Sequence, residues 1–558
     1  MEKPWLKDFD EDVAKWRSKW EALYDEGVPA KPIYPDIPMK DLFKKCVEKF
    51  PEKTYLIWRD TTLTYKETYK MVCQLANALL DMGVQKGDRV AVMLPNVPAY
   101  VIAIHACFKI GAIEVPCNHL YTVTELKAQF KDCGAETVIS IAPHAEKAIQ
   151  TLDDADTPIK RVIAVQAPGY TKEIPSGENI FDFDQILQSA ADTETDIEVL
   201  PTDIARLQYT GGTTGVPKGC VLTNAMIMTQ AVRTSEWFRP GVPPVDFITL
   251  CAIPLNHIYA YNGNVLICMY EGGTIVLVDV PTPDNLLANI STHKPNIFAA
   301  VPAMIIGLIN HPEISNTDIS SLVGIFSGSA ALAVNTLQKF EELTGGKIVE
   351  GYGMSETINV LTLNPMFRLR KFGSCGMVWP DTDLVVVDVE TGTKVMPRGE
   401  LGELIARGPQ NITEYWEKPE ETANAVTDGW LHTGDIVYMD EDGFIFIMDR
   451  KKDMIIVSGF NVYPKDIDEV MFKHPKVMEA CTVGIPNEKQ GESVKCFVVP
   501  KPGETMTQDE VIAFCREHLA PYKIPRFVEF IDAVPRTSVG KPDRKVLVAQ
   551  EIAKQQSK

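Results

Sequence analysis

The stretch Tyr209-Thr210-Gly211-Gly212-Thr213-Thr214-Gly215-Val216-Pro217-Lys218-Gly219 combines glycines, hydroxyl side chains and a single lysine, and it follows a predicted strand. Glycines let backbone amides turn toward a phosphate, hydroxyls add neutral donors, and lysine supplies positive charge. The stretch therefore predicts a phosphate-binding loop. It is not a Walker A loop, because that motif needs Gly directly before the Lys and Ser or Thr directly after it. From this motif alone, a Gly/Thr hairpin without a ligand stays a possible interpretation.

Helix and strand patterns alternate before this loop. Thr64 and Glu67 have the spacing of a capping box, and apolar residues follow at helical intervals toward Gly83. The further expected elements are strands over residues 89–94, 113–116 and 136–141, a helix over 98–110, and a helix that opens at Thr122. Such alternation predicts layered α/β structure with mostly parallel sheets.

The character of the chain changes after about residue 380. Short strand patterns over 384–389 and 402–407, separated by turns, predict a β-rich subdomain. Beyond Arg450, strand patterns over 454–457, 480–485 and 495–499 alternate with helix patterns over 464–472 and 508–518. We therefore expect an α/β fold with a large layered N-terminal domain, residues 1–450, and a small α+β C-terminal domain, residues 451–558.

Bulk composition excludes several classes of protein. A net charge of −20 opposes general binding to nucleic acid or to anionic lipid. The chain has no apolar stretch long enough to span a bilayer, and its first residues lack the pattern of a secretory signal. Its twelve cysteines are scattered without a Cys-x-x-Cys pair, which is typical of reduced core thiols. We expect a cytoplasmic protein without an integral membrane segment.

Seven segments together resemble the adenylate-forming superfamily of acyl-CoA synthetases, adenylation domains and luciferases. They are, in family order, residues 209–219, 254–259, 328–330, 351–357, 429–435, 449–453 and 540–541. The N-terminal half is most similar to medium- and long-chain acyl-CoA ligases. The resemblance implies AMP-forming ligation of a carboxylic acid to coenzyme A, with ATP, Mg²⁺ and coenzyme A as cofactors or co-substrates, in a monomer or homodimer.

The resemblance also implies the residues that bind ATP. Tyr352 is expected against adenine, Asp435 and Arg450 at the ribose hydroxyls, and Glu356 and Thr210 at magnesium, which prefers oxygen ligands. Taken singly, Glu356 could cap a helix and Asp435 could form an ordinary surface ion pair. The implied ATP-binding residues are Thr210, Gly211, Gly212, Thr213, Thr214, Gly215, Lys218, Gly328, Ser329, Ala330, Gly351, Tyr352, Gly353, Ser355, Asp435 and Arg450.

No general base is needed for activation, because a carboxylic acid is already ionised at neutral pH. Positive charge around the transition state is needed, and Lys541 matches the family lysine that serves this step. Without the other motifs it would be read as an exposed lysine. Val539 replaces a frequent serine, and Glu414 replaces a frequent glycine, so the fine contacts of one loop and one local turn are in doubt.

Transfer to coenzyme A is implied by residues near the start of the C-terminal domain. Lys452 matches the family's hinge, about which the small C-terminal domain is mobile. Gly459, with Ser458 and Phe460 beside it, matches the glycine that lets the pantetheine arm pass the backbone. A plain turn at the end of a strand is the alternative for Gly459.

The acyl pocket is predicted from the stretch 256–261, which contains no acid. Amino-acid substrates are disfavoured, because their ammonium group would lack a partner. His257 resembles the gate between the acyl pocket and the thiol tunnel, although a structural histidine is the competing interpretation. Tyr259, Val301 and Gly328 predict an apolar pocket for fatty, aromatic or alicyclic acids.

Two other activities share the nucleotide motifs. A stand-alone adenylation enzyme would load the thiol of a carrier protein, and a luciferase-like oxygenase would oxidise its adenylate. A nucleotide sensor without catalysis would need neither Glu356 nor Lys541.

Overall fold

The computed structural model describes residues 3–152, 154, 156–210, 218–243, 246–457, 460–487, 491–537 and 542–556. The chain divides into two compact units. The large unit comprises residues 19–383 and 406–431, and the small unit comprises residues 1–18, 384–405 and 432–558. The predicted domain boundary between residues 450 and 451 stays a prediction.

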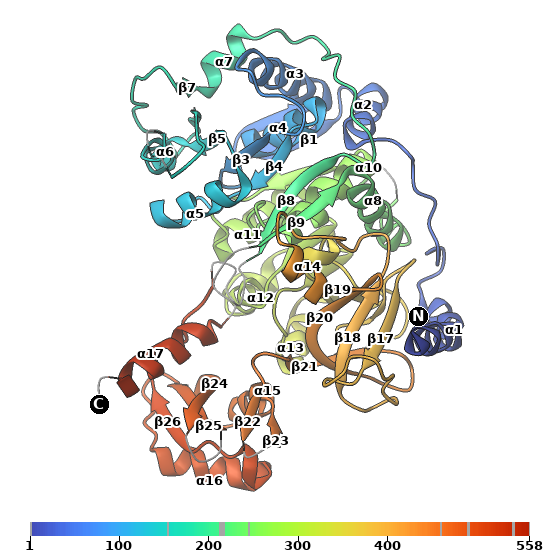
Figure 1. The fold of residues 1–558 in the computed structure, drawn as a ribbon, viewed down its shortest axis with the longest axis vertical. Coiled ribbons are helices and arrows are strands. Elements are labelled where there is room, and N and C mark those ends of the chain that lie inside the picture. Colours follow the sequence, from blue (N-terminus) through green and yellow to red (C-terminus); the bar gives the residue numbers. More distant parts are fainter. Residues whose placement is uncertain are drawn as a thin grey trace. The chain divides into compact units, whose positions relative to one another are not determined.

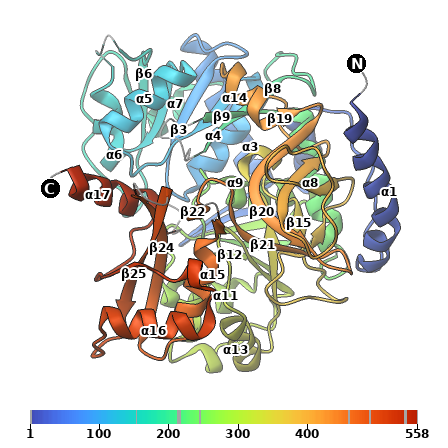
Figure 2. The ribbon, with the colours of Figure 1, turned by 60° about the horizontal axis from the view of Figure 1, so that its bottom comes forward.

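The first sheet of the large unit has seven strands, and all neighbouring pairs except the last are parallel. Its order is β7 (Ile180–Asp182), β6 (Arg161–Val165), β5 (Thr137–Ile141), β3 (Arg89–Met93), β4 (Ile113–Pro116), β8 (Ile204–Thr210) and β9 (Lys218–Thr223). Figures 1 and 2 show α5 (Val123–Cys133) and α6 (Ala142–Ile149), in cyan, beside these strands. The predicted α/β layering is confirmed.

Local capping explains why the helix starts could be predicted. Thr64 accepts the backbone N–H of Glu67 at 3.1 Å, while the Glu67 carboxylate accepts the N–H of Thr64 at 2.8 Å, at the start of α3 (Tyr65–Asp81). Thr122 and Glu125 repeat this capping box at the start of α5. Two unpaired donors are satisfied at each helix start, which fixes where the helix begins.

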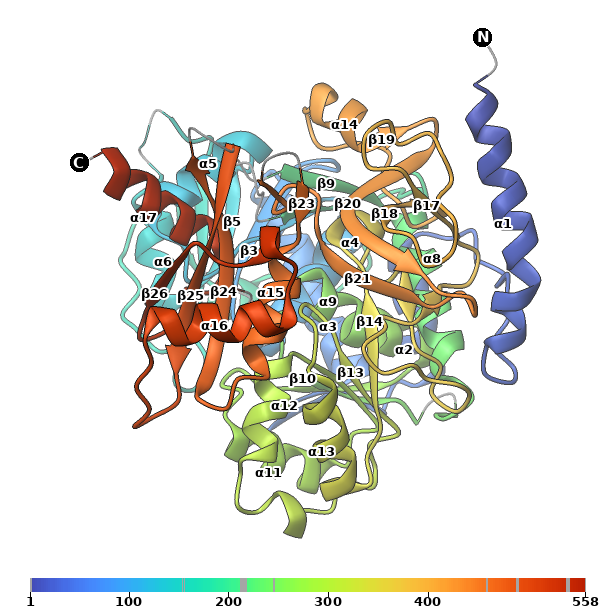
Figure 3. The ribbon, with the colours of Figure 1, turned by 90° about the horizontal axis from the view of Figure 1, so that it is seen from below.

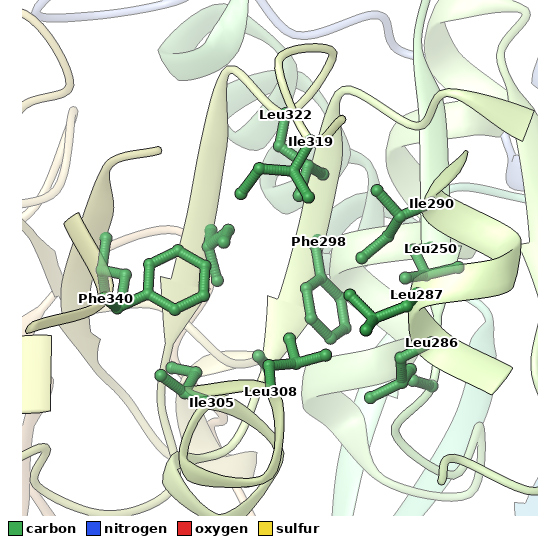
Figure 4. Close-up of a cluster of buried hydrophobic side chains, with 14 of the residues drawn as sticks. Leu250, Leu286, Leu287, Ile290, Phe298, Ile305, Leu308, Ile319, Leu322 and Phe340 are labelled. Carbon is green, nitrogen blue, oxygen red and sulfur yellow. The ribbon is translucent and has the colours of Figure 1, made fainter. Parts of the chain in front are cut away.

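The second sheet of the large unit has nine strands. Its order is β16 (Met377–Val378), β15 (Thr362–Leu363), β14 (Ile348–Tyr352), β13 (Gly324–Ser327), β12 (Ile297–Ala300), β10 (Ile248–Cys251), β11 (Thr274–Leu277), β1 (Thr54–Trp58) and β2 (Thr61–Thr64). Three helices cover one face: α11 (Pro283–His293), α12 (Pro302–Ile309) and α13 (Val334–Thr344). Figure 4 shows Phe298 of β12 among Leu287 of α11, Leu308 of α12 and their neighbours. Burial of this apolar cluster holds the sheet and its helices together.

Helix α4 (Pro98–Ile110) is buried along its length after the first residue and contacts β1, β3 and β4, so it lies between the two sheets. A helix that is apolar all round is typical of such a position. His105 and Lys109 are its buried polar residues. The His105 ring stacks on Phe43 with centroids 3.7 Å apart, and its Nε2 lies 2.8 Å from the Tyr55 hydroxyl oxygen. Complete burial lowers the pKa of His105 to about 3.

This buried histidine predicts acid sensitivity of the large unit. Between pH 6.5 and 3 the unfolded chain binds a proton at His105 that the native chain does not. The contribution of neutral His105 to the free energy of unfolding is therefore complete above pH 6.5. As the pH drops below 6.5, this contribution falls by about 1.4 kcal/mol for each pH unit. Urea unfolding at pH 7.0 and pH 5.0 should show a smaller decrease for His105→Gln than for the parent protein. Equal decreases would contradict this assignment.

The small unit holds most of a five-stranded sheet that corresponds to the predicted β-rich segment. Its strands are β17 (Asp383–Val387), β18 (Gly402–Arg407), β20 (Trp430–Met439), β19 (Val426–Thr427) and β21 (Ile445–Arg450). The strand predicted over 384–389 ends two residues early. Asp388 accepts the backbone N–H groups of Thr391, Thr393 and Lys394, which turns the chain away from the sheet.

The second sheet of the small unit has helices on both faces. Its order is β23 (Phe460–Val462), β22 (Ile455–Val457), β25 (Gly491–Pro500) and β24 (Val477–Asn487), with β26 (Phe527–Phe530) also paired to β25. One set of alternating residues, with Val494 and Val498, packs under α15 (Pro464–Phe472) and α16 (Gln508–His518). The other set, with Cys481 and Val483, packs under α17 (Arg544–Gln556). Figure 3 shows α16 running across β24 and β25. The predicted α+β character is confirmed.

All twelve cysteines are buried and free, as their scattered spacing predicted. Of the helices that the structure describes, none combines the length and the apolar character needed to cross a membrane.

Candidate active site

The carboxyl edge of the nine-stranded sheet gathers most of the predicted site residues of the large unit. Strands β11, β10, β12, β13 and β14 lie side by side and parallel, and the chain order reverses between β10 and β12. Ligands of open α/β sheets bind at such a reversal, outside the carboxyl ends of the strands. At or just beyond these carboxyl ends lie His257, Tyr259, Val301, Gly328, Ser329, Ala330, Gly351, Tyr352, Gly353, Ser355 and Glu356.

Tyr259 fixes the loops that follow two neighbouring strands. Its hydroxyl donates to the carbonyl oxygen of Phe326 at 2.9 Å and lies 3.4 Å from that of Ala300. Burial raises the pKa of Tyr259, so the phenol stays protonated. A Cβ at Gly328 would lie 3.1 Å from the Tyr259 ring, which explains why a glycine stands there. Tyr259 and Gly328 are thus in contact, as an acyl-pocket wall requires.

His257 caps a short helix with its side chain. Its Nδ1 accepts the backbone N–H of Tyr259 at 3.3 Å, so the proton of a neutral His257 lies on Nε2. Helix α9 (Ile258–Ala260) continues into a π-helical segment, η1 (Tyr261–Leu266), and then into α10 (Ile267–Glu271). Single π-helical turns inside α-helices are frequent at functional sites.

Glu356 lies in a tightly folded loop after β14. It belongs to the 3₁₀ turn η3 (Ser355–Thr357), and the following residues Ile358 and Asn359 both have left-handed φ, 48° and 89°. A Cβ at Gly353 would collide with the carbonyl of Asn359, so only glycine fits. Backbone strain of this kind collects at ligand sites.

Tyr415 connects Glu356 to Lys218 of the predicted phosphate-binding loop. The Tyr415 hydroxyl donates to Glu356 Oε1 at 2.7 Å, and Lys218 Nζ lies 5.3 Å from the centre of the Tyr415 ring. Burial and the Glu356 charge raise the pKa of Tyr415, which keeps it a donor. One phenol therefore holds a buried carboxylate at its edge and a cation over its face.

The segment around Glu414 settles the doubt about its turn. The Glu414 carbonyl accepts the N–H of Val221 at 3.3 Å, and Trp416 donates its N–H to Gly219 at 2.8 Å, so the segment runs along β9. Glu414 itself is exposed and has no left-handed φ. A side chain is therefore accommodated where the family often has glycine.

The two ends of the predicted phosphate-binding loop lie side by side. Thr210 ends β8, Lys218 begins β9, and the two are Cα partners in the antiparallel pair. The strand expected before the loop is thus confirmed. Gly211, Gly212, Thr213, Thr214 and Gly215 lie outside the described residues.

In the small unit, the predicted ribose-binding residues are direct neighbours. Asp435 in β20 and Arg450 in β21 are Cα partners, and Arg450 Nε lies 3.2 Å from Asp435 Oδ1. The Asp435 side chain is only 4% exposed, whereas that of Arg450 is 42% exposed. A buried carboxylate beside an accessible guanidinium is better placed to bind hydroxyl groups than a fully solvated ion pair.

Two family models match the chain. The AMP-binding enzyme model matches residues 43–416, and the AMP-binding enzyme C-terminal domain model matches residues 466–541. The chain belongs to the AMP-binding enzyme family. A long-chain-fatty-acid–CoA ligase of Bacillus subtilis (strain 168) is 38% identical to it over 556 residues, 95% of this chain and 98% of that protein.

Further members of the AMP-binding family extend the comparison. A feruloyl-CoA synthase of Amycolatopsis sp is 34% identical over 88% of this chain and 94% of that protein. The crystal structure of ATP-bound MatB from Rhodopseudomonas palustris has a TM-score of 0.83 at 28% identity, covering 92% of this chain and 98% of that one. The fold expected from the resemblance is confirmed.

Lys452 follows Arg450, one of the two predicted ribose-binding residues of this AMP-binding enzyme. Partial desolvation and the neighbouring Arg450 lower the pKa of Lys452 to about 8. Phe460 begins β23, whereas Ser458, Gly459 and Lys541 lie outside the described residues. The roles implied for Lys452 and for these four residues stay predictions.

Glu403 supports the turn just before Asp435, the predicted ribose-binding carboxylate. It accepts the backbone N–H of Gly434 at 3.1 Å and lies 3.0 Å from Lys451 Nζ and 3.6 Å from His432 Nδ1. Burial opposes ionisation of Glu403, but the bonds from His432 and Lys451 outweigh it and hold its pKa below the usual range. Sequence reasoning missed Glu403 and Tyr415. The signal available in the sequence for Glu403 was an acidic residue within a predicted strand. The signal for Tyr415 was an aromatic residue next to Glu414.

Proposed function

We propose that this AMP-binding enzyme is an AMP-forming acyl-CoA ligase. It activates a hydrophobic carboxylic acid with ATP and transfers the acyl group to coenzyme A. The observation that carries the proposal is the Lys218–Tyr415–Glu356 arrangement, because it offers a cation for phosphates and an oriented oxygen ligand for a magnesium ion at one phenol ring.

The first step needs charge neutralisation more than proton transfer. A carboxylate oxygen of the acid bonds to the α-phosphorus of ATP, and the bond from that phosphorus to pyrophosphate breaks. Lys218 and Lys541 place positive charge at the phosphates while negative charge shifts to the leaving group.

Glu356 and Thr210 suit a magnesium ion. Both offer oxygen ligands, and the Glu356 carboxylate is buried and oriented by Tyr415. Bound there, magnesium would neutralise phosphate charge.

In this proposal three residues bind the nucleoside. Tyr352 takes the adenine, and Asp435 with Arg450 takes the ribose hydroxyls. The segment Gly328–Ala330 offers backbone donors to the nucleotide. Ser329 there has a left-handed φ of 69°, a conformation that costs about 1 kcal/mol or more and is kept where a site needs it.

The second step forms the thioester. The sulfur of coenzyme A bonds to the carbonyl carbon of the adenylate, the bond to the AMP oxygen breaks, and the thiol proton is released. We assign the hinge to Lys452, the gate to His257 and the passage of the pantetheine arm to Gly459 with Ser458 and Phe460. A thiol acceptor is consistent with the relatives named above, two of which are named as a long-chain-fatty-acid–CoA ligase and a feruloyl-CoA synthase.

Gly459→Leu should separate the two steps. We expect unchanged ATP–pyrophosphate exchange and a loss of acyl-CoA formation on the order of 100-fold, because a side chain would block the arm that carries the thiol. Exchange and thioester output are measured on the same preparation, with Glu504→Leu, at an exposed position of the same segment of the chain, as a control for folding. Undiminished thioester output would remove Gly459 from the passage.

The acid is hydrophobic in this proposal. Residues 256–261 contain no acid that could hold a substrate ammonium, and the relatives are named for long-chain fatty acids and for ferulate. Straight-chain acids of 6 to 18 carbons, aromatic acids and an amino acid form the test panel, with thioesters identified by mass spectrometry. Activity confined to the amino acid, or oxygen uptake with light emission, would contradict the proposal. Cytoplasmic location and a monomeric or dimeric state stay predictions.

A further inference from the structure

A wholly buried ion pair lies between the two sheets of the large unit. Glu114 in β4 and Arg206 in β8 are Cα partners, and both side chains are 0% exposed. Arg206 Nη1 donates to Glu114 Oε2 at 2.6 Å. The Arg206 guanidinium also lies 4.1 Å from the centre of the Tyr261 ring.

Hydrogen bonds link this ion pair to the loop that carries His257. Arg206 Nη2 donates to the Leu255 carbonyl at 3.4 Å, and its Nε donates to Gln208 Oε1 at 2.9 Å. Gln208 Nε2 in turn donates to the Asn256 carbonyl at 3.1 Å. The two residues immediately before His257 are therefore held by their backbone oxygens from strand β8.

Asn96 holds the same loop from a second side. Its Oδ1 accepts the N–H of Leu255 at 2.9 Å, and its Nδ2 donates to the carbonyl of Ile253 at 2.9 Å and to that of Cys251 at 3.1 Å. These contacts tie the loop to the end of β10. The loop 252–257 is thus fixed along its length by polar side chains that are themselves buried.

Stability alone does not account for the ion pair. Removing two charges from water is costly, and a well-packed apolar pair of the same volume would serve the core equally well or better. What an apolar pair could not do is donate to the buried carbonyl of Leu255, or bond the side chain of Gln208, which in turn donates to the Asn256 carbonyl. The position of the loop depends on the polar groups.

We propose that Glu114, Arg206 and Gln208 are positioning residues that fix the loop 252–257 and so place His257, and Tyr259 just beyond it, at the acyl site. Gln208 lies two residues before Thr210 on the same strand, so the strand that enters the phosphate-binding loop also sets the acyl-pocket loop. The two substrates are thereby aligned by one rigid element. This inference rests on the proposed function.

The test replaces the pair without leaving a lone buried charge. In the double variant Glu114→Met with Arg206→Met, we expect a folded protein whose apparent KM for the acid rises, and whose rate of acyl-CoA formation falls, each on the order of 10-fold or more. The apparent KM for ATP should change less, because Thr210 is held by the main-chain pairing of β8, which these side-chain changes leave in place. Gln208→Met, which leaves both charges in place, should show the same pattern more weakly.

Arg233→Met is the matched control. Arg233 is equally buried in the large unit, but its side-chain bonds go to Thr229, Gln230, Pro380 and Thr382. It should lower the melting temperature without changing the ratio of the two apparent KM values. Unchanged acid KM and thioester rate in folded Gln208→Met and in the double variant would overturn the inference. A parent protein that activates no acid would instead refute the proposed function.

Discussion

Lys541→Ala should reduce acid-dependent ATP–pyrophosphate exchange by on the order of 100-fold or more, while thioester formation from preformed acyl-adenylate largely survives. The first step brings a carboxylate toward a polyphosphate, so loss of a cation there removes transition-state stabilisation. In the second step the acyl group passes from AMP to the sulfur of coenzyme A. The carbonyl carbon that is attacked is neutral, so this step does not need that charge. Exchange of labelled pyrophosphate into ATP measures the first step, and acyl-CoA release from synthetic adenylate measures the second.

Lys473→Ala is the control for this experiment, because Lys473 is an exposed lysine at the end of α15 in the same C-terminal segment. It should leave both steps near the parent values. If Lys541→Ala lowered both steps equally, Lys541 would not be specific to activation. If both variants behaved like the parent, Lys541 would be an ordinary surface lysine.

Glu356→Gln should also lower the exchange rate by on the order of 100-fold, and it should raise the magnesium concentration needed for half-maximal rate. The amide keeps an oxygen that can accept the Tyr415 hydrogen bond but loses the charge that binds a divalent cation. Titration of exchange with magnesium at saturating ATP measures both effects.

Tyr415→Phe provides a graded comparison for Glu356. It keeps the ring beneath Lys218 but removes the hydroxyl that orients the carboxylate, so we expect a loss of about tenfold. Parent-like exchange and magnesium dependence in Glu356→Gln would exclude Glu356 as a metal ligand. A greater loss in Tyr415→Phe than in Glu356→Gln would place the main role on the phenol.

Elements with local signals could be predicted closely from the sequence. The expected helix over residues 98–110 and strand over 113–116 match α4 and β4. Capping boxes at Thr64 and Thr122 act within three residues, so their positions can be read along the chain. The strand over 384–389 was predicted too long, because the turn made by Asp388 depends on side-chain bonds to residues further along.

The arrangement of strands could not be predicted in this way. The reversal between β10 and β12 arises because β11 pairs on one side of β10 and β12 on the other. No periodicity in either strand specifies which neighbour it takes. Yet this reversal explains why segments around 257, 301, 328 and 356 meet at one edge.

The candidate site was predicted where a motif is continuous in sequence and was missed where it is assembled from distant segments. Glu356 and Asp435 belong to recognisable motifs. Tyr415 meets Glu356 across 59 positions of sequence, and Arg206 meets Glu114 across 92. Such pairs follow from strand register and loop packing, which the sequence pattern alone does not specify.

The measurement that tests the central claim most directly is the fate of the oxygen atoms of the acid. A hydrophobic acid labelled with ¹⁸O in both carboxylate oxygens is incubated with the enzyme, ATP, magnesium and coenzyme A. The ¹⁸O content of each product is then measured by mass spectrometry. Attack on the α-phosphorus predicts one ¹⁸O atom in each AMP, with pyrophosphate unlabelled and one acyl-CoA formed for each AMP. Label in inorganic phosphate together with ADP, or AMP released without label, would contradict activation through an acyl-adenylate.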